Sequence, residues 1–418
     1  MATSEDPSAG EGVKSPSARL IGRAFRAAFL TLALLSVCLL LGLLWLALES
    51  APVAFDAAAA ARVTVSPLER IVPGPGLPAG LPVQRANNNV DLVRHGDDVF
   101  MAFRTAPFHF ASDKAEVIVL RRGADGKWLT EKRIHLGRDL REPRLFSFKG
   151  RLLLYFFSGG THPLRFEPDR IQVCERTREG QWTVPQAVYE PGYVVWRVRE
   201  RQGTAYMSVY YGTNIYGKGD RGEVRLLVSE DGYAWRNLSD APQVDRVGAE
   251  EGEFIFDDEG NLAAIVRLEV GGGALVCTAP RDDLAAWKCR FTPYKVDSSL
   301  LFRNGGDCYV IGRRNVAGPA ARGAFLPETL QNAWSLAAYS LTRKRTALYR
   351  LDLERLECRP LLDFPSRGDT AFAGAAPQED GSLLVVNYSS PVDGPDWPWL
   401  AGQLLPTHLY EMRLAFAE

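Results

Sequence analysis

GDDVFMAFR, the segment at residues 96–104, recurs in altered form five more times, as GRLLLYFF (150–157), GTAYMSVYY (203–211), GNLAAIVR (260–267), GDCYVIGR (306–313) and GSLLVVNY (381–388). In each copy a glycine follows an apolar stretch and polar residues, and alternating apolar residues follow it. This is the pattern of a hairpin between two buried strands. The glycines are 54, 53, 57, 46 and 75 residues apart, about the length of a four-stranded sheet. The repeat predicts an all-β chain folded as a six-bladed β-propeller.

A series of tryptophans has the same period. Trp128, Trp182, Trp235 and Trp287 are 54, 53 and 52 residues apart. Three of them follow an acidic residue and a glycine, so we expect an indole beneath an outer hairpin turn in four of the blades. Residues 314–345, rich in Gly, Ala, Arg and Pro, lengthen the fifth repeat and predict a loop over one face. Outside the N-terminal segment, no helical periodicity is expected.

The N-terminal segment predicts a membrane anchor. Ala27–Leu48 carries no charge, and as a helix its 22 residues reach about 33 Å, enough to cross a bilayer. Four basic residues precede it and Glu49 follows, which favours a cytoplasmic N-terminus with the rest of the chain periplasmic or extracellular. A signal peptide cleaved at the small residues of Ala57–Ala61 is the alternative. The predicted division is a disordered tail (1–26), a transmembrane signal anchor (27–48), an extracytoplasmic linker (49–86) and the propeller (87–418).

Charge and cysteine content limit the classes of partner and cofactor that this chain can bind. The chain has 49 Lys and Arg against 50 Asp and Glu, so no net positive field is available to hold nucleic acid. Cys277 and Cys289 flank a predicted hairpin turn, where a disulfide or two free buried thiols are equally possible. No cysteine spacing resembles a zinc site, and neither a metal nor a cofactor is expected.

SEDGYAW, at Ser229–Trp235, resembles the Asp box of sialidases, in which Asp and Ser fix a hairpin turn above a packed Trp. Other segments, among them NNNVDLVRHGDDVFMAFR, GEFIFDDEGNLAAIVR and SRGDTAFAGA, look like successive blades of bacterial sialidase-like proteins. The resemblance covers about residues 87–415 and implies a sialidase-like six-bladed propeller.

The resemblance also implies site residues. Sialidases bind the substrate carboxylate with three arginines and use an Asp as acid and base. On this chain Asp113 matches the acid/base loop, Glu251 or Glu253 matches the Glu that assists a Tyr nucleophile, and Arg267 matches one arginine.

Two positions depart from the family's pattern. Asn89, Val90 and Asp91 replace the first-strand Arg-Ile-Pro motif, and Phe372 stands where the nucleophilic Tyr is expected. A phenylalanine has no hydroxyl to form a glycosyl-enzyme. Hydrolysis by the usual sialidase route is therefore not expected.

The propeller geometry predicts further candidates, because the first residues of each inner strand point into the central funnel. Three carboxylates at those starts, Asp91, Glu142 and Glu251, could act as acid, base and pKa modulator in a glycosidase, with Asp113 as a fourth catalytic candidate. The second strands end at equivalent positions, and three of these are arginines. The six residues are Arg104, Phe157, Tyr210, Arg267, Arg313 and Tyr388. The predicted substrate-binding residues are Arg104, Arg197, Glu253, Arg267, Arg313, Phe372 and Tyr388. Alternatively, each arginine simply pairs with a neighbouring carboxylate to close the ring.

The sequence therefore predicts a membrane-anchored, extracytoplasmic sialidase-like propeller that binds a glycan, an acidic glycan included, in its funnel. One alternative is an active glycoside hydrolase, similar to an exo-sialidase, that uses Asp91, Glu142 and Glu251. The other is a non-enzymatic scaffold whose loops, especially residues 314–345, hold a protein partner.

Overall fold

The computed structural model describes residues 16–48, 53–212, 221–269, 272–318 and 325–417. The chain forms two compact units, residues 1–50 and residues 51–418. The described part of the first is one helix, α1 (Pro16–Leu48), whose residues Arg23–Leu44 have the length and composition of a membrane span or of a signal sequence. Of the predicted disordered tail (1–26), residues 1–15 lie outside the described residues, whereas residues 16–26 are helical and belong to α1.

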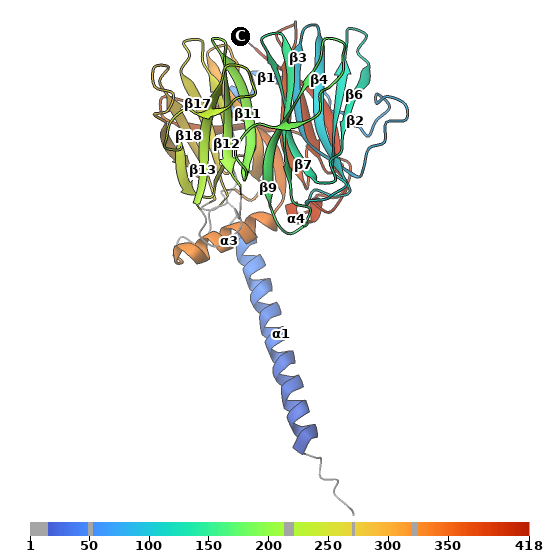
Figure 1. Cartoon of the computed structure of the whole chain (residues 1–418). Helices are drawn as coiled ribbons and strands as arrows, with labels where there is room; N and C mark the ends of the chain where they lie inside the picture. Colours follow the sequence, from blue (N-terminus) through green and yellow to red (C-terminus); the bar gives the residue numbers. More distant parts are fainter. Residues whose placement is uncertain (1–15, 49–52, 213–220, 270–271, 319–324, 418) are drawn as a thin grey trace, which may run out of the picture. The chain divides into compact units, whose positions relative to one another are not determined.

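The second unit is the predicted six-bladed β-propeller (Figure 1). Every blade is an antiparallel sheet whose first three strands follow the chain from the centre outward. The blades are, in order, β3 to β6 (Ala86–His95, Asp98–Ala106, Glu116–Arg122, Trp128–Ile134), β7 to β10 (Asp139–Phe148, Arg151–Gly159, Pro168–Arg176, Gln186–Ala187), β11 to β15 (Tyr193–Arg201, Thr204–Tyr211, Arg221–Ser229, Arg236–Asn237, Val244–Val247), β16 to β19 (Ala249–Phe256, Leu262–Leu268, Ala274–Ala279, Lys288–Thr292), β20 to β23 (Asp297–Asn304, Asp307–Asn315, Lys344–Asp352, Glu357–Asp363) and β24 to β26 (Thr370–Pro377, Leu383–Ser389, His408–Phe416).

The last blade is completed by the start of the second unit. Strands β1 (Val63–Val65) and β2 (Glu69–Val72) both pair with β26, and Val63 lies opposite Phe416. Before them, Asp56 caps a short helix, α2 (Ala57–Ala60). Part of the segment predicted as a linker therefore belongs to the propeller. The repeat did not predict these strands, because they are short and pair with residues some 350 positions later.

Two further helices lie at one end of the propeller, α3 (Glu328–Ser340) and α4 (Trp399–Gly402) (Figure 1). The expectation of no helix beyond the N-terminal segment was wrong. Helix α3 buries only Ser335, Ala338 and Tyr339, a stripe too narrow to produce a clear apolar period. The described part of the insertion predicted as a loop in the fifth repeat (314–318 and 325–345) therefore includes a helix at one end of the propeller.

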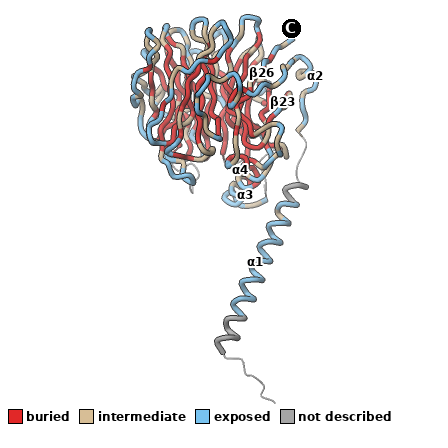
Figure 2. The backbone as a smooth tube through the Cα atoms, turned by 90° about the vertical axis from the view of Figure 1, so that its right-hand side faces the viewer, coloured by how far each residue is buried: buried red, intermediate tan, exposed pale blue. Residues whose placement is uncertain are grey.

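The buried residues follow the strands, while the connections are mostly exposed (Figure 2). The periodic tryptophans lie at outer hairpins: Trp128 and Trp182 are buried, whereas Trp235 and Trp287 are half-buried. In the turn before Trp235, the carboxylate of Asp231 accepts hydrogen bonds from the amides of Tyr233 and Ala234, both at 2.8 Å. Cys277 and Cys289 face each other on β18 and β19 and form a disulfide.

Candidate functional site

The same irregularity occurs in the inner strand of every blade. Each inner strand shifts register against its neighbour near its start. In five blades a residue other than glycine has a positive φ at this shift, which costs of order 1 kcal/mol or more. All five line one cavity: Asn89 (φ 48°), Glu142 (54°), Glu251 (49°), Ser298 (53°) and Phe372 (60°). The bulges thus turn equivalent side chains of five blades toward one space.

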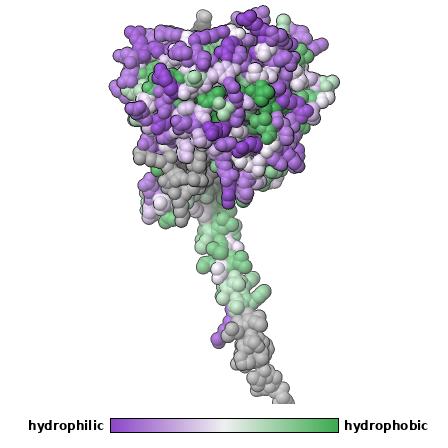
Figure 3. Space-filling model, in the orientation of Figure 1, coloured by the Kyte–Doolittle hydropathy of each residue, from purple (hydrophilic) through white to green (hydrophobic). Residues whose placement is uncertain are grey.

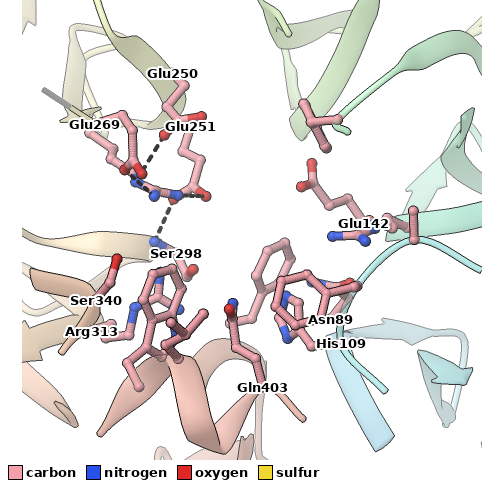
Figure 4. A pocket seen from close by; sticks show the side chains of 18 of the residues that line it. Asn89, His109, Glu142, Glu250, Glu251, Glu269, Ser298, Arg313, Ser340 and Gln403 are labelled. Carbon is pink, nitrogen blue, oxygen red and sulfur yellow. Dashed lines mark hydrogen bonds and ion pairs between the residues drawn. The ribbon is translucent and has the colours of Figure 1, made fainter. Parts of the chain in front are cut away.

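This cavity has a volume of about 310 Å³. Its wall is completed by the ends of second strands, by loop residues 163–166, and by residues of α3 and α4 (Figure 4). Five of the six second-strand residues predicted as equivalent occupy one register position, directly before the shifts: Arg104, Phe157, Arg267, Arg313 and Tyr388 pair with Asn88, Arg141, Glu250, Asp297 and Ala371. Tyr210 pairs with Val194, one position before the last pair that precedes its shift.

Glu142 is a buried carboxyl group with an unused oxygen. Its Oε1 accepts a hydrogen bond from the Tyr210 hydroxyl at 3.3 Å, whereas Oε2 has no hydrogen-bond partner among the described residues. Burial, reinforced by the charge of Glu251, raises the pKa of Glu142 to about 8. At neutral pH this side chain is therefore protonated and can donate as well as accept a hydrogen bond.

Glu251 lies on the opposite wall of the cavity (Figure 4). Its Oε1 accepts from Arg267 Nη1 at 2.5 Å and its Oε2 from the backbone N–H of Ser298 at 2.6 Å. Both oxygens of Glu251 are therefore held by groups of the protein. The cavity thus places a neutral carboxylic acid across from a hydrogen-bonded carboxylate.

Arg267 is surrounded by acidic groups. Its Nε lies 3.0 Å from Glu250 and 3.3 Å from Asp297, and its Nη2 pairs with Glu269. Lys295 adds a second cation, 3.1 Å from Glu269. The charge of Arg267 is therefore fully compensated inside the protein.

Arg313 is held in a similar way. It donates from Nε to the Tyr339 hydroxyl at 3.0 Å and from Nη1 to the Thr370 carbonyl at 3.3 Å, and its Nη2 lies 3.5 Å from Asp297. Its guanidinium carbon lies 4.6 Å from the ring centroid of Trp399. Neither of these two arginines is free to hold a ligand carboxylate, and the other two that line the cavity, Arg141 and Arg165, pair with Asp139 and Glu167.

A His–Asp pair forms another part of the wall. His109 Nδ1 lies 2.6 Å from Asp369 Oδ2, and Asp369 Oδ1 accepts from the Tyr388 hydroxyl at 3.1 Å and from Trp399 Nε1 at 3.0 Å. Burial lowers the pKa of His109 despite the nearby Asp369 carboxylate, so the imidazole is neutral at pH 7. The two residues of this pair are 260 positions apart, so no local sequence pattern indicates it.

Six of the predicted site residues line the cavity: Glu142, Glu251, Arg267, Arg313, Phe372 and Tyr388. Three others are buried in ion pairs deeper in the channel, where Arg197 lies 2.8 Å from both Asp91 and Glu253. Asp91 and Arg197 border a separate cavity of about 510 Å³ that is lined by the far parts of the inner strands. Arg197 is thus neutralised by Asp91 and Glu253 within the protein. These three residues fit the alternative prediction, in which arginines pair with neighbouring carboxylates to close the ring.

Arg104 and Asp113 also lie away from the cavity lining. Arg104 is fully buried, pairs with Asp139 at 2.8 Å and donates to the carbonyls of Phe108 and Phe110. It thereby fixes the loop that carries His109. Of the three arginines predicted at the ends of second strands, Arg267 and Arg313 line the cavity and Arg104 does not. Asp113 is exposed in a turn, where its carbonyl accepts from His135 at 2.8 Å.

Several lining residues had no signal in the sequence. Glu250 and Glu269 flank Arg267, Ser298 supplies a backbone N–H, and Gln403 comes from the turn after α4. Glu250 was recognisable only as a neighbour of Glu251. Within the described ranges, no three His, Cys, Asp or Glu side chains form a group that could hold a metal ion.

Comparison with known proteins identifies the fold. No protein-family model matches the sequence, and no curated protein matches it either. Among solved structures, a protein of unknown function from Dyadobacter fermentans is 13% identical with a TM-score of 0.59, over 85% of this chain and 99% of the other. Trypanosoma rangeli sialidase is 14% identical with a TM-score of 0.56, over 79% of this chain and 55% of the sialidase, so the chain spans about half the sialidase's length. The propeller is sialidase-like in fold.

Proposed function

We propose that this chain is a membrane-anchored, extracytoplasmic propeller that binds a sugar between Glu142 and Glu251. The observation that carries the proposal is the pair of carboxyl groups on opposite walls of the cavity: a neutral Glu142 with one oxygen unpaired among the described residues, and Glu251 held by Arg267 and the Ser298 N–H. Together they offer one donor and several acceptors to the hydroxyl groups of a sugar. The aromatic side chains of Phe372, Tyr388 and Trp399 line the same cavity and add apolar surface for a sugar ring. A Trypanosoma rangeli sialidase of the same fold has been solved in complex with sialic acid, which supports a sugar ligand by analogy of fold.

The charges favour a neutral sugar over an acidic one. Four arginines line the cavity and are the cationic candidates for a sugar carboxylate: Arg141, Arg165, Arg267 and Arg313. All four already lie within ion-pair distance of protein carboxylates. An anionic ligand would lie beside the acidic side chains of Glu250, Glu251 and Glu269, while the guanidinium groups of the lining are already paired with protein carboxylates. The acidic glycan included in the sequence-based hypothesis is therefore not the ligand we propose.

Glycan binding gives the first expected result. In mild detergent, the full chain should bind one or more neutral oligosaccharides on a glycan array and in calorimetry. Glu142→Ala removes the unpaired carboxyl group and should weaken that binding about tenfold, the usual effect of losing one or two hydrogen bonds. Glu357→Ala is the matched control, because Glu357 lies half-exposed at the start of outer strand β23. Equal affinity of both variants, or no retained glycan at all, would count against the proposal.

A second candidate function is glycoside hydrolysis, favoured by the same pair of carboxyl groups. Glu142 would protonate the leaving oxygen, and the Glu251 carboxylate would act as base or nucleophile from the other wall. This differs from the sialidase route, since Phe372 has no hydroxyl.

The hydrolase hypothesis predicts a distinctive pH profile. Turnover on a panel of neutral glycosides should fall as the pH rises through about 8, because Glu142 must remain protonated to act as the acid. Glu251→Gln should reduce the rate at least a thousandfold (roughly, for a catalytic carboxylate) while the protein stays folded. If wild type turns over no glycoside, the protein binds its sugar without cleaving it.

A further inference from the structure

The propeller exposes large apolar side chains mainly at the end that carries the cavity. We call six of them the apolar rim: Leu164, Phe325, Leu330, Trp397, Leu400 and Leu404. They lie on the connections around α3 and α4 and on the loop between β8 and β9, and Leu164 and Leu400 also line the cavity. Leu164 is 85% exposed, Phe325 79% and Leu404 56%. Figures 1 and 2 both show α3 and α4 at one end of the propeller.

The opposite end is polar. It carries the six glycine turns between first and second strands, whose tips hold exposed residues such as Asp97, Lys149, Gln202, Glu259 and Asp380. The side of the propeller seen in Figure 3 is also largely hydrophilic, with scattered apolar patches. Scattered apolar residues are normal on a soluble protein, but a set gathered around a cavity mouth marks an interaction surface.

The chain enters the propeller near this same end. The ring of Phe55 lies 5.1 Å from the guanidinium of Arg314, the neighbour of the cavity residue Arg313. From there the chain runs through α2 to Val63, which pairs with Phe416 at the other end of the blade. The first fixed point after α1 is thus on the cavity-bearing half of the propeller.

The connection to α1 is short. Only seven residue steps separate Leu48, the last residue of α1, from Phe55. Seven residues reach about 25 Å even when fully extended. If α1 spans a bilayer, the point where the chain enters the propeller cannot lie farther than this from the end of the span.

We propose that the apolar rim lies on the lipid surface, so that the cavity takes the sugar head group of a glycolipid. The rim supplies the side chains suited to that position, with leucines for the acyl boundary and Trp397 for the interface. The contact with lipid does not depend on any sugar. The identity of the ligand as a glycolipid rests on the proposed function.

A labelling experiment tests the contact with lipid. In the full chain with Cys38→Ser, single cysteines are introduced by Leu330→Cys, Leu404→Cys and, as control, Leu129→Cys. Leu129 is 46% exposed and lies on β6, near the strand end opposite the cavity. Each is labelled with an environment-sensitive dye and reconstituted in phosphatidylcholine vesicles with brominated lipid. The two rim labels should be quenched and the Leu129 label should not. Unquenched rim labels, or rim labels shielded by a dimer in detergent without lipid, would overturn the proposal.

A binding experiment separates the two proposals. The double variant Leu330→Ser and Leu404→Ser is compared with Leu129→Ser on two probes, a neutral glycolipid in phosphatidylcholine vesicles and the same oligosaccharide free in detergent. We expect the rim variant to lose about tenfold in apparent affinity for the glycolipid and less than about twofold for the free sugar. An unchanged affinity for the glycolipid would overturn the rim proposal alone. Failure of wild type to bind either probe would overturn the proposed function and leave the quenching result to decide the contact with lipid.

Discussion

Glu142→Gln is expected to stabilise the propeller increasingly as the pH rises, relative to wild type. The folded-state pKa of Glu142 is about 8, above its unfolded value of 4.5. Wild type therefore keeps a proton in the folded state that the unfolded chain has lost, and its stability falls with pH between these two values. The difference in unfolding free energy between variant and wild type should grow by about 4 kcal/mol from roughly pH 5 to roughly pH 9. Urea unfolding across this range measures it.

The matched control for this experiment is Glu251→Gln. That substitution removes the charge that pairs with Arg267, so the variant should be less stable than wild type throughout the same pH range. Parallel stability curves for Glu142→Gln and wild type would show that Glu142 is ionised in the folded protein. The neutral acid required by both functional proposals would then be lost.

Arg267→Gln is expected to lower the free energy of unfolding by about 4 kcal/mol, because it leaves several buried carboxylates without their cation. Glu250, Glu251, Glu269 and Asp297 all lie within ion-pair distance of Arg267. Lys295, and Arg313 beside Asp297, would remain to compensate part of that charge. Urea unfolding again measures the loss.

Two further variants make the Arg267 result interpretable. Arg267→Lys keeps the charge and should recover part of the lost stability, even if Arg267→Gln folds too poorly to measure. Arg350→Gln removes a half-exposed pair with Asp307 on an outer strand and should cost less than about 1 kcal/mol. A loss for Arg267→Gln as small as that for Arg350→Gln would mean that these carboxylates are protonated rather than paired.

The architecture was predictable because it is periodic. Six copies of one hairpin imply six equivalent sheets, and equivalence alone placed Arg267, Arg313 and Tyr388 at the ends of second strands, where the register confirms them. The N-terminal strands and α3 have no copy elsewhere in the chain. The repeat therefore carried no information about them.

The lining of the cavity was less predictable, because it depends on bulges and on distant partners. A bulge changes which side chains face the channel, so residues two positions apart on one strand can have different surroundings. Glu251 lines the cavity, whereas Glu253 pairs with Arg197. Which arginine meets which carboxylate depends on contacts across blades. The pair of His109 with Asp369, 260 residues apart, shows how far such contacts reach.

The central claim is that a neutral sugar occupies the space between Glu142 and Glu251. The most direct measurement is a structure of the full chain with the best-bound neutral oligosaccharide from the array. We predict a sugar ring in this cavity, with a hydroxyl group within hydrogen-bond distance of Glu142 Oε2. A sugar bound elsewhere on the propeller, with the space between the two carboxyl groups left to water, would contradict the claim.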